Sequence, residues 1–351
     1  MRIPAPTPRA LLLATALLTA PALAGDIYFV DIFVPDIQVD GSIRRIGTDG
    51  TGLTTLVETG RGLRSLDVDP IAGKIYWTDV DNFVIRRSDL DGGNIEDVVN
   101  SGLIFPAAID VVPSLDKMYW LDQDASVGNA NLDGSGSGVL IDSVTHRGVA
   151  VDVDAGKIYW STSIDRFRGQ IRRANLDGTQ QEIVVSTGLP EFKPSAIAID
   201  PAGGKIYWTD YVVDVVQRAN LADGSDIEFL WAAGANHNPR GIALDLSEGK
   251  IYWGQDIDFD GTGGRIMRMD LNGSNPEIFL DGVGLVNYLA IVESGACVAD
   301  WNGDGAVDTR DVLAFLNAWT AGGQDADVNG DGVVDTRDVT AFLNAWNAGC
   351  P

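Results

Sequence analysis

One short motif occurs five times along the chain, and this repetition limits the possible folds more than any other feature of the sequence. Each copy has a lysine, an aliphatic residue or methionine, and then a Tyr-Trp pair. The intervals between successive tyrosines are 43, 40, 48 and 45 residues, and the tyrosines are Tyr76, Tyr119, Tyr159, Tyr207 and Tyr252. A period of this length is typical of folds built from many copies of one small structural unit.

Each repeat has the pattern of several short strands. An apolar run such as residues 241–244 lies about ten residues before each motif. A further run such as residues 171–176 follows the motif and ends at an Asp-Gly or Asn-Gly turn. Short strands separated by such turns predict one blade of a β-propeller.

Half a repeat stands at each end of the repeat region. Residues 27–31 correspond to the motif strand without an upstream strand, and residues 287–292 correspond to the upstream strand without a successor. Joined together, these halves make a sixth blade and close the ring, which removes the exposed sheet edges of an open array. The sequence therefore predicts an all-β six-bladed propeller over residues 25–292.

The repeats resemble the YWTD repeats of the low-density-lipoprotein-receptor class B family, whose fold is a six-bladed propeller. The third copy has Ser161-Thr162 and the fifth has Gly254-Gln255 where the motif has Thr-Asp. We expect each Tyr and Trp to pack between blades, and each Thr-Asp pair to satisfy backbone donors where the strand ends. The resemblance implies a scaffold and leaves its ligand open, with a protein or a carbohydrate as the candidates.

Two sets of positions are candidates for a site in the central channel. Thirteen residues before the motif tryptophan, where the inner strands begin, three of the repeats carry Arg64, Arg147 and Arg240. These arginines either bind an anionic carboxylate, sulfate or phosphate group or neutralise neighbouring acids. Ten residues before the tryptophan, Asp67 and Asp110 replace alanine, and they either bind a cation, share a proton or form a solvated pair.

The propeller region carries no recognisable catalytic motif. The two histidines, His146 and His237, belong to no His-x-x-x-His pair, and there is no Gly-x-Ser-x-Gly elbow. Residues 256–261 match the first half of a calcium loop, but Met267 stands at the twelfth position, so a hairpin is expected. The leading hypothesis is a non-catalytic binding or scaffolding protein. The alternative is a carboxylate- or metal-dependent hydrolase or lactonase.

The C-terminal segment, residues 297–351, contains one calcium-loop pattern twice, 27 residues apart. Oxygen-bearing side chains stand at positions 1, 3, 5, 9 and 12 of each loop, and a glycine stands at position 6. The backbone carbonyl of position 7 is expected to be a further ligand. An oxygen-only ligand set predicts two calcium ions rather than zinc or copper. The predicted ligands are Asp300, Asn302, Asp304, Ala306, Asp308 and Asp311 in the first loop, and Asp327, Asn329, Asp331, Val333, Asp335 and Asp338 in the second.

An amphipathic helix is predicted after each loop, and none before it, which separates this unit from an EF-hand. The unit resembles a type I dockerin, in the variant that ends in Gly-Cys. The resemblance implies a cohesin-like or other cell-surface partner. It also implies that the residues at loop positions 10 and 11 face this partner, and that the domain can bind it in two symmetry-related orientations. Those positions are Thr309, Arg310, Thr336 and Arg337. Phe315, Leu316, Trp319 and their second-copy equivalents are expected to form a small core.

The remaining features predict an exported chain. Residues 1–24 have the pattern of a signal peptide, and Cys297 and Cys350 are expected to form a disulfide in an oxidising compartment. The expected linker between the propeller and the dockerin-like domain is residues 293–296. No later stretch is long and apolar enough to span a membrane, and a net charge of −25 disfavours nucleic acid. We therefore expect a secreted protein that a partner holds at a cell surface.

Overall fold

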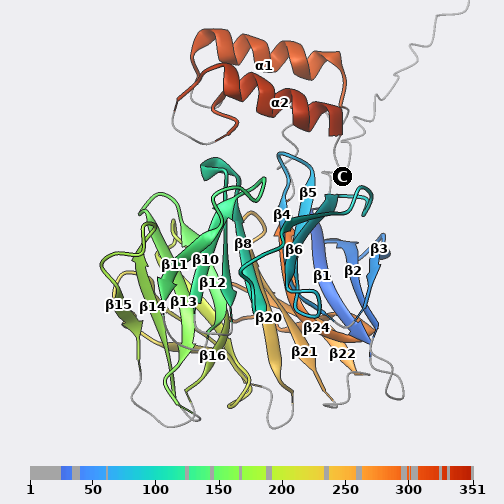
Figure 1. Cartoon of the computed structure of the whole chain (residues 1–351). Coiled ribbons are helices and arrows are strands. Elements are labelled where there is room, and N and C mark those ends of the chain that lie inside the picture. Colours follow the sequence, from blue (N-terminus) through green and yellow to red (C-terminus); the bar gives the residue numbers. More distant parts are fainter. Residues whose placement is uncertain are drawn as a thin grey trace, which may run out of the picture.

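The fold is a ring of β-sheets with two helices beyond one face of the ring (Figure 1). It was determined as a computed structural model of the whole chain. The structure describes residues 25–33, 40–60, 62–122, 126–142, 146–165, 168–186, 192–232, 237–257, 263–293, 299, 301, 307–323, 326–329 and 333–348.

Six four-stranded antiparallel sheets form the ring, which confirms the predicted six-bladed propeller. From the inner to the outer strand, blade 1 is β4 (Leu63–Asp69), β5 (Lys74–Asp79), β6 (Val84–Asp89) and β7 (Glu96–Val99). Blade 2 is β8 (Pro106–Val112), β9 (Lys117–Asp122), β10 (Ser126–Asn131) and β11 (Gly138–Asp142). Blade 3 is β12 (His146–Asp152), β13 (Lys157–Ser163), β14 (Gly169–Asn175) and β15 (Glu182–Val185).

The remaining blades follow the same order. Blade 4 is β16 (Pro194–Asp200), β17 (Lys205–Asp210), β18 (Val215–Asn220) and β19 (Glu228–Ala232). Blade 5 is β20 (Pro239–Asp245), β21 (Lys250–Asp256), β22 (Gly264–Asp270) and β23 (Glu277–Val283). The split blade takes its inner strand β24 (Leu285–Val292) from the end of the repeat region and β1 (Asp26–Phe33), β2 (Asp40–Gly47) and β3 (Thr54–Thr59) from its beginning.

The motif strand is the second strand of each blade, and neighbouring blades cover both of its faces. Its Tyr and Trp side chains are therefore buried, as Tyr76 and Trp77 illustrate at 1% exposure each. The Asp that ends the motif caps backbone groups, since Asp79 accepts hydrogen bonds from the N–H groups of Asp81 and Asn82 at 3.2 and 3.1 Å. These contacts are those expected of a structural motif.

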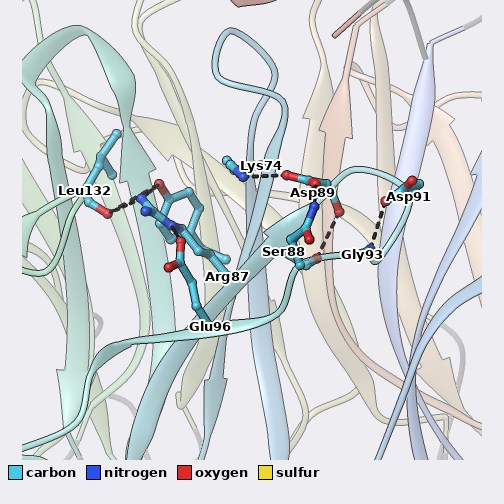
Figure 2. Close-up of polar contacts among 10 residues, drawn as sticks. Lys74, Arg87, Ser88, Asp89, Asp91, Gly93, Glu96 and Leu132 are labelled. Atoms are coloured by element: carbon cyan, nitrogen blue, oxygen red, sulfur yellow. Dashed lines mark hydrogen bonds and ion pairs between the residues drawn. The ribbon is translucent and has the colours of Figure 1, made fainter.

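Arginines on the third strands join neighbouring blades. Arg87 Nη1 donates to the carbonyl oxygen of Leu132 in blade 2 at 3.0 Å, while its Nε pairs with Glu96 on β7 at 2.6 Å (Figure 2). The same arrangement recurs at Arg173, Arg218 and Arg268. Because Arg268 donates to Thr48 of the split blade, one of these contacts lies at the ring closure.

The two variant copies of the motif have separate explanations. Ser161 fills the role of threonine, because its hydroxyl accepts from Gly148 N–H at 2.9 Å and donates to the Ser195 carbonyl at 2.6 Å. Gly254 lies against the split blade, where a Cβ atom would stand 2.2 Å from the Val286 carbonyl oxygen. Glycine is needed there because β21 and β24 approach so closely.

The two faces of the ring differ in what they carry. The mouth face is the one on which the inner strands begin, near Arg64. The hairpin at residues 80–83 lies on the same face, because Leu63 at the start of β4 pairs with Asp79 at the end of β5. The opposite face, which we call the tether face, is where the inner strands end and where the chain leaves the propeller after Val292. Helix α2 lies near the tether face, since Asn344 lines a cavity there with Gly73 and Lys74 of blade 1.

The C-terminal helices α1 (Thr309–Ala321) and α2 (Thr336–Ala348) pack against each other around two stacked phenylalanine rings. The ring centroids of Phe315 and Phe342 are 4.2 Å apart, and both side chains are fully buried. The expected core was wrong for Leu316 and its counterpart Leu343, which are 37% and 44% exposed. They point away because the helix face that meets its partner is filled by the aromatic rings.

Several predictions fall on residues outside the described ranges. They are the signal peptide at residues 1–24, most of the linker, and the pairing of Cys297 with Cys350. Since both cysteines lie outside the described residues, the disulfide stays a prediction. No helix in the described part of the chain is long and apolar enough to cross a membrane.

Candidate functional site

A small cavity of about 70 Å³ opens at the centre of the mouth face. Residues from all six inner strands line it, and Arg64, Arg147 and Arg240 are among them. The structure thus brings the three arginines of the sequence analysis together around one opening. Ala107, Ser195 and Asn287 alternate with them around the ring.

The three arginines have few anionic partners. Arg64 lies over the ring of Phe105, with 5.2 Å between its guanidinium carbon and the ring centroid, and Arg147 lies 4.6 Å from the centroid of Tyr211. Arg240 reaches a carboxylate, that of Asp256 at 3.7 Å. Burial, together with the positive charges of Arg240 and Arg147, lowers the pKa of Arg64. The arginines therefore lie near enough to repel one another.

Tyr288 closes the channel below the arginines, and the sequence analysis missed this role. Its hydroxyl donates to the carbonyl oxygen of Arg147 on β12, the inner strand opposite β24. Burial raises the pKa of Tyr288 to about 12, so the phenol stays neutral. A sequence signal existed, because the other five repeats carry a small residue at this position: Ser65, Ala108, Gly148, Ala196 and Gly241.

Below Tyr288 the channel widens into a chamber of about 260 Å³ that contains Asp67 and Asp110. Asp67 accepts from the N–H groups of Val111 at 2.6 Å and Val68 at 2.8 Å, and burial raises its pKa to about 6. Burial and the charge of Asp67 raise the pKa of Asp110 well above its ordinary value.

The carboxyl groups of Asp67 and Asp110 lie close enough to interact, and burial of two like charges side by side favours one proton shared between them. Each Asp also bonds to the backbone of the following inner strand, at Val111 on β8 and at Val151 on β12. The pair therefore ties three neighbouring blades together. This geometry favours proton sharing among the three alternatives that the sequence left open.

Exposed apolar side chains stand on the mouth face in blades 1 to 4. They stand on the hairpins between second and third strands or just before an inner strand, and all are at least 38% exposed. This apolar collar consists of Phe83, Ile104, Ile164, Val212 and Val213. Such side chains around a charged centre are typical of protein-binding surfaces.

The acidic segment at residues 256–261 connects β21 to β22, as expected of a hairpin, and part of it lies outside the described residues. Ile257 N–H donates to the Gly263 carbonyl at 3.3 Å across this connection. Within the described residues, no group of three or more His, Cys, Asp or Glu side chains is arranged to hold a metal ion.

The calcium loops are described in part. Asp300, Asn302, Asp304, Ala306 and Asp331 lie outside the described ranges. Both position-12 carboxylates, Asp311 and Asp338, are fully buried, and Asp338 accepts from the N–H groups of Asn329 and Asp335 at 3.2 and 2.7 Å. A buried carboxylate at the centre of an oxygen-lined loop suits a hard cation, so the residues fit calcium.

Each loop is tied to the helix of the other copy. Trp319 Nε1 donates to the Asp335 carbonyl at 2.7 Å, and Trp346 Nε1 donates to the Asp308 carbonyl at 3.0 Å. These reciprocal bonds give the domain a two-fold pseudosymmetry.

The arginines expected to face the partner, Arg310 and Arg337, have side chains that are 64% and 62% exposed. Each makes a fork with the position-9 carboxylate of its own loop, with the shortest N–O distances at 2.7 Å for Asp308 and 2.8 Å for Asp335. These forks lower the pKa of both carboxyls. Thr309 and Thr336 are the first residues of α1 and α2.

Comparison with known proteins agrees with both halves of this description. Residues 298–347 match the dockerin type I domain family. In the repeat region, low-density lipoprotein receptor-related protein 1 from Pyricularia oryzae is 34% identical over 133 residues, which cover 34% of this chain and 43% of that protein. Low-density lipoprotein receptor-related protein 5 from Mus musculus is 37% identical over 172 residues, or 46% of this chain and 10% of that protein.

The chain is a YWTD-type six-bladed propeller followed by a type I dockerin domain. It spans less than half the length of either receptor-related protein. Type I dockerin domains usually bind calcium, and the presence of one implies a cohesin partner and suggests an extracellular, cellulosome-type complex.

Solved structures share the propeller fold with this YWTD–dockerin chain. The nidogen/laminin complex contains a chain with a TM-score of 0.65 and 19% identity, which covers 77% of this chain and 99% of that one. TolB from Acinetobacter baumannii gives a TM-score of 0.64 at 15% identity, with 78% of this chain and 67% of that chain covered. At these identities the likeness extends to the fold alone.

Proposed function

We propose that this chain is a secreted, non-catalytic binding protein whose propeller takes a partner on its mouth face while its dockerin domain docks to a cohesin. One observation carries the proposal. The apolar collar and the arginine mouth lie on one face, and the chain continues to the dockerin domain from the opposite face. A docked molecule therefore keeps its mouth face open to a second partner.

The names of the related proteins support a binding role over a catalytic one. Two are receptor-related proteins, and the nidogen chain was solved in a complex with laminin. The competing function is a carboxylate-dependent hydrolase or lactonase acting through Asp67 and Asp110. Against it, both carboxylates are engaged with backbone donors, and Tyr288 separates them from the mouth.

In this proposal residues 1–24 are a signal peptide, residues 25–292 are the binding head, residues 293–296 are a linker and residues 297–351 are the docking module. Two calcium ions occupy the loops, held by the carboxylates, amides and position-7 carbonyls at the loop positions described above. A Cys297–Cys350 disulfide closes the module. The exposed Thr-Arg pairs that follow position 9 of each loop contact the cohesin, in either of two related orientations.

The test captures the full chain on an immobilised type I cohesin in calcium and then passes extracellular protein from the producing cells over the surface. We expect release by EDTA and capture of a second protein by the docked chain. Ile164→Asp with Val212→Asp should abolish that capture. Ile95→Asp, a change to a residue 51% exposed beside β7 toward the tether face, is the matched control and should leave it intact.

Two results would refute the proposal. The first is equal capture by the collar variant and by the control, because the mouth face would then take no part in binding. The second is turnover of lactones, esters or glycans that disappears in Asp67→Ala with Asp110→Ala, provided that the variant keeps its fold.

A further inference from the structure

The arginines at the mouth have a regular arrangement. Arg64, Arg147 and Arg240 come from β4, β12 and β20, which are every second inner strand in the ring. The three arginines therefore line the mouth cavity from three sides, with one inner strand between each pair. Between them stand uncharged residues, so no acid of the ring itself interrupts the positive field.

The arginines of the mouth are compensated by fewer carboxylates than the arginines that join the blades. On the third strands, Arg87, Arg173 and Arg268 each pair with a glutamate at 2.6 or 2.7 Å. By contrast, among the described residues no carboxylate lies within ion-pair distance of Arg64 or Arg147, and Arg240 has one, Asp256, at 3.7 Å. In a chain of net charge −25, three arginines that line one opening with a single ion pair among them indicate a binding site for an anion.

The geometry also selects among anions. A carboxylate presents two oxygens in one plane, which suits one or two arginine forks. The end group of a sulfate or phosphate monoester presents three oxygens around its ester bond. With that bond along the channel axis, each oxygen faces one arginine, and the remainder of the ligand leaves through the mouth.

We propose that Arg64, Arg147 and Arg240 together bind the terminal oxyanion of a sulfate or phosphate monoester carried by the propeller's ligand. This inference rests on the proposed function, since it names the chemistry that the mouth face recognises. Tyr288 forms the floor of the site, and the cavity of about 70 Å³ admits a single such group. Phe105 and Tyr211 hold two of the guanidinium groups by stacking, which reduces the entropy lost on binding.

The test is isothermal titration of the full chain with three matched sugars: glucose 6-sulfate, glucose 6-phosphate and glucuronate. We expect the sulfate, the phosphate or both to bind, and glucuronate to bind about tenfold more weakly or less. The preferred ester identifies which of the two sources supplies the group. Arg64→Gln, Arg147→Gln and Arg240→Gln should each weaken binding about tenfold, whereas Arg168→Gln, an exposed arginine elsewhere on the mouth face, should not.

Arg147→Lys is the control for misfolding, because it keeps the positive charge and removes only the two-pronged guanidinium group. We expect affinity between those of wild type and Arg147→Gln, with melting temperature unchanged. Glucuronate binding as tightly as the esters, or full affinity in the three glutamine variants, would overturn the inference.

The capture experiment of the preceding section keeps the two proposals apart. If no ester binds while collar-dependent capture persists, the anion site is refuted and the binding face remains. If esters bind through the arginines and no collar-dependent capture occurs, the anion site stands and the proposed protein-binding function fails.

Discussion

The close approach at the ring closure gives a prediction whose magnitude follows from the structure. In Gly254→Ala the new Cβ would lie 2.2 Å from the Val286 carbonyl oxygen and 2.9 Å from Val286 Cβ. Ordinary van der Waals contact begins near 3.4 Å, so β21 and β24 must separate by about 1 Å. Forcing an extra methyl group into a packed site costs about 1–3 kcal/mol.

For a domain of this size each kcal/mol lowers the melting temperature by about 2–4 °C, so Gly254→Ala should melt roughly 2–12 °C below wild type. Differential scanning calorimetry measures the propeller transition directly. Gly138→Ala is the matched control, because its Cβ meets no atom within 4 Å, and it should leave the melting temperature unchanged or slightly raised. If both variants melt with the wild type, the close approach of β21 and β24 does not exist and the account of this variant motif is wrong.

Two further predictions concern the carboxylates. Burial and the charge of Asp67 raise the pKa of Asp110, so the native state favours the protonated form of this carboxyl group. The stability that the bound proton contributes is therefore complete below pH 4 and is lost as the pH rises. The melting temperature of Asp110→Asn minus that of wild type should therefore increase from pH 4 to pH 8. A difference that stays constant over that range would contradict the shared proton. EDTA should loosen the α1–α2 domain, because Asp311 and Asp338 would then be buried carboxylates without a cation. Calorimetry of the full chain should show the loss of a separate transition while that of the propeller stays, and an unchanged trace would exclude calcium-dependent folding.

The repeat made the fold accessible from sequence alone. A tyrosine every 40 to 48 residues fixed the blade length, and the half-repeats at residues 27–31 and 287–292 fixed the closure. Both signals are local and periodic, and a propeller places equivalent positions of every repeat in equivalent environments. The same reasoning located Arg64, Arg147 and Arg240 at one end of the inner strands, where the structure places them around one cavity.

Contacts that depend on differences between repeats were harder to predict. Tyr288 crosses the channel to β12, a contact that no single repeat contains. The collar residues stand in connections that follow no repeat pattern, so the sequence alone does not show that they share one face of the ring. Leu316 was assigned to the core from helical spacing, and the spacing alone does not say which of two apolar faces meets the other helix.

The opposed placement of mouth and tether bears on how several copies would act together. If many molecules dock along a scaffold of cohesins, every mouth faces outward from it. A polymer bearing repeated ester groups could then engage several propellers at once, so weak individual contacts would combine through a high effective concentration. Retention on such a polymer would depend on the spacing of cohesins as much as on the affinity of one arginine ring.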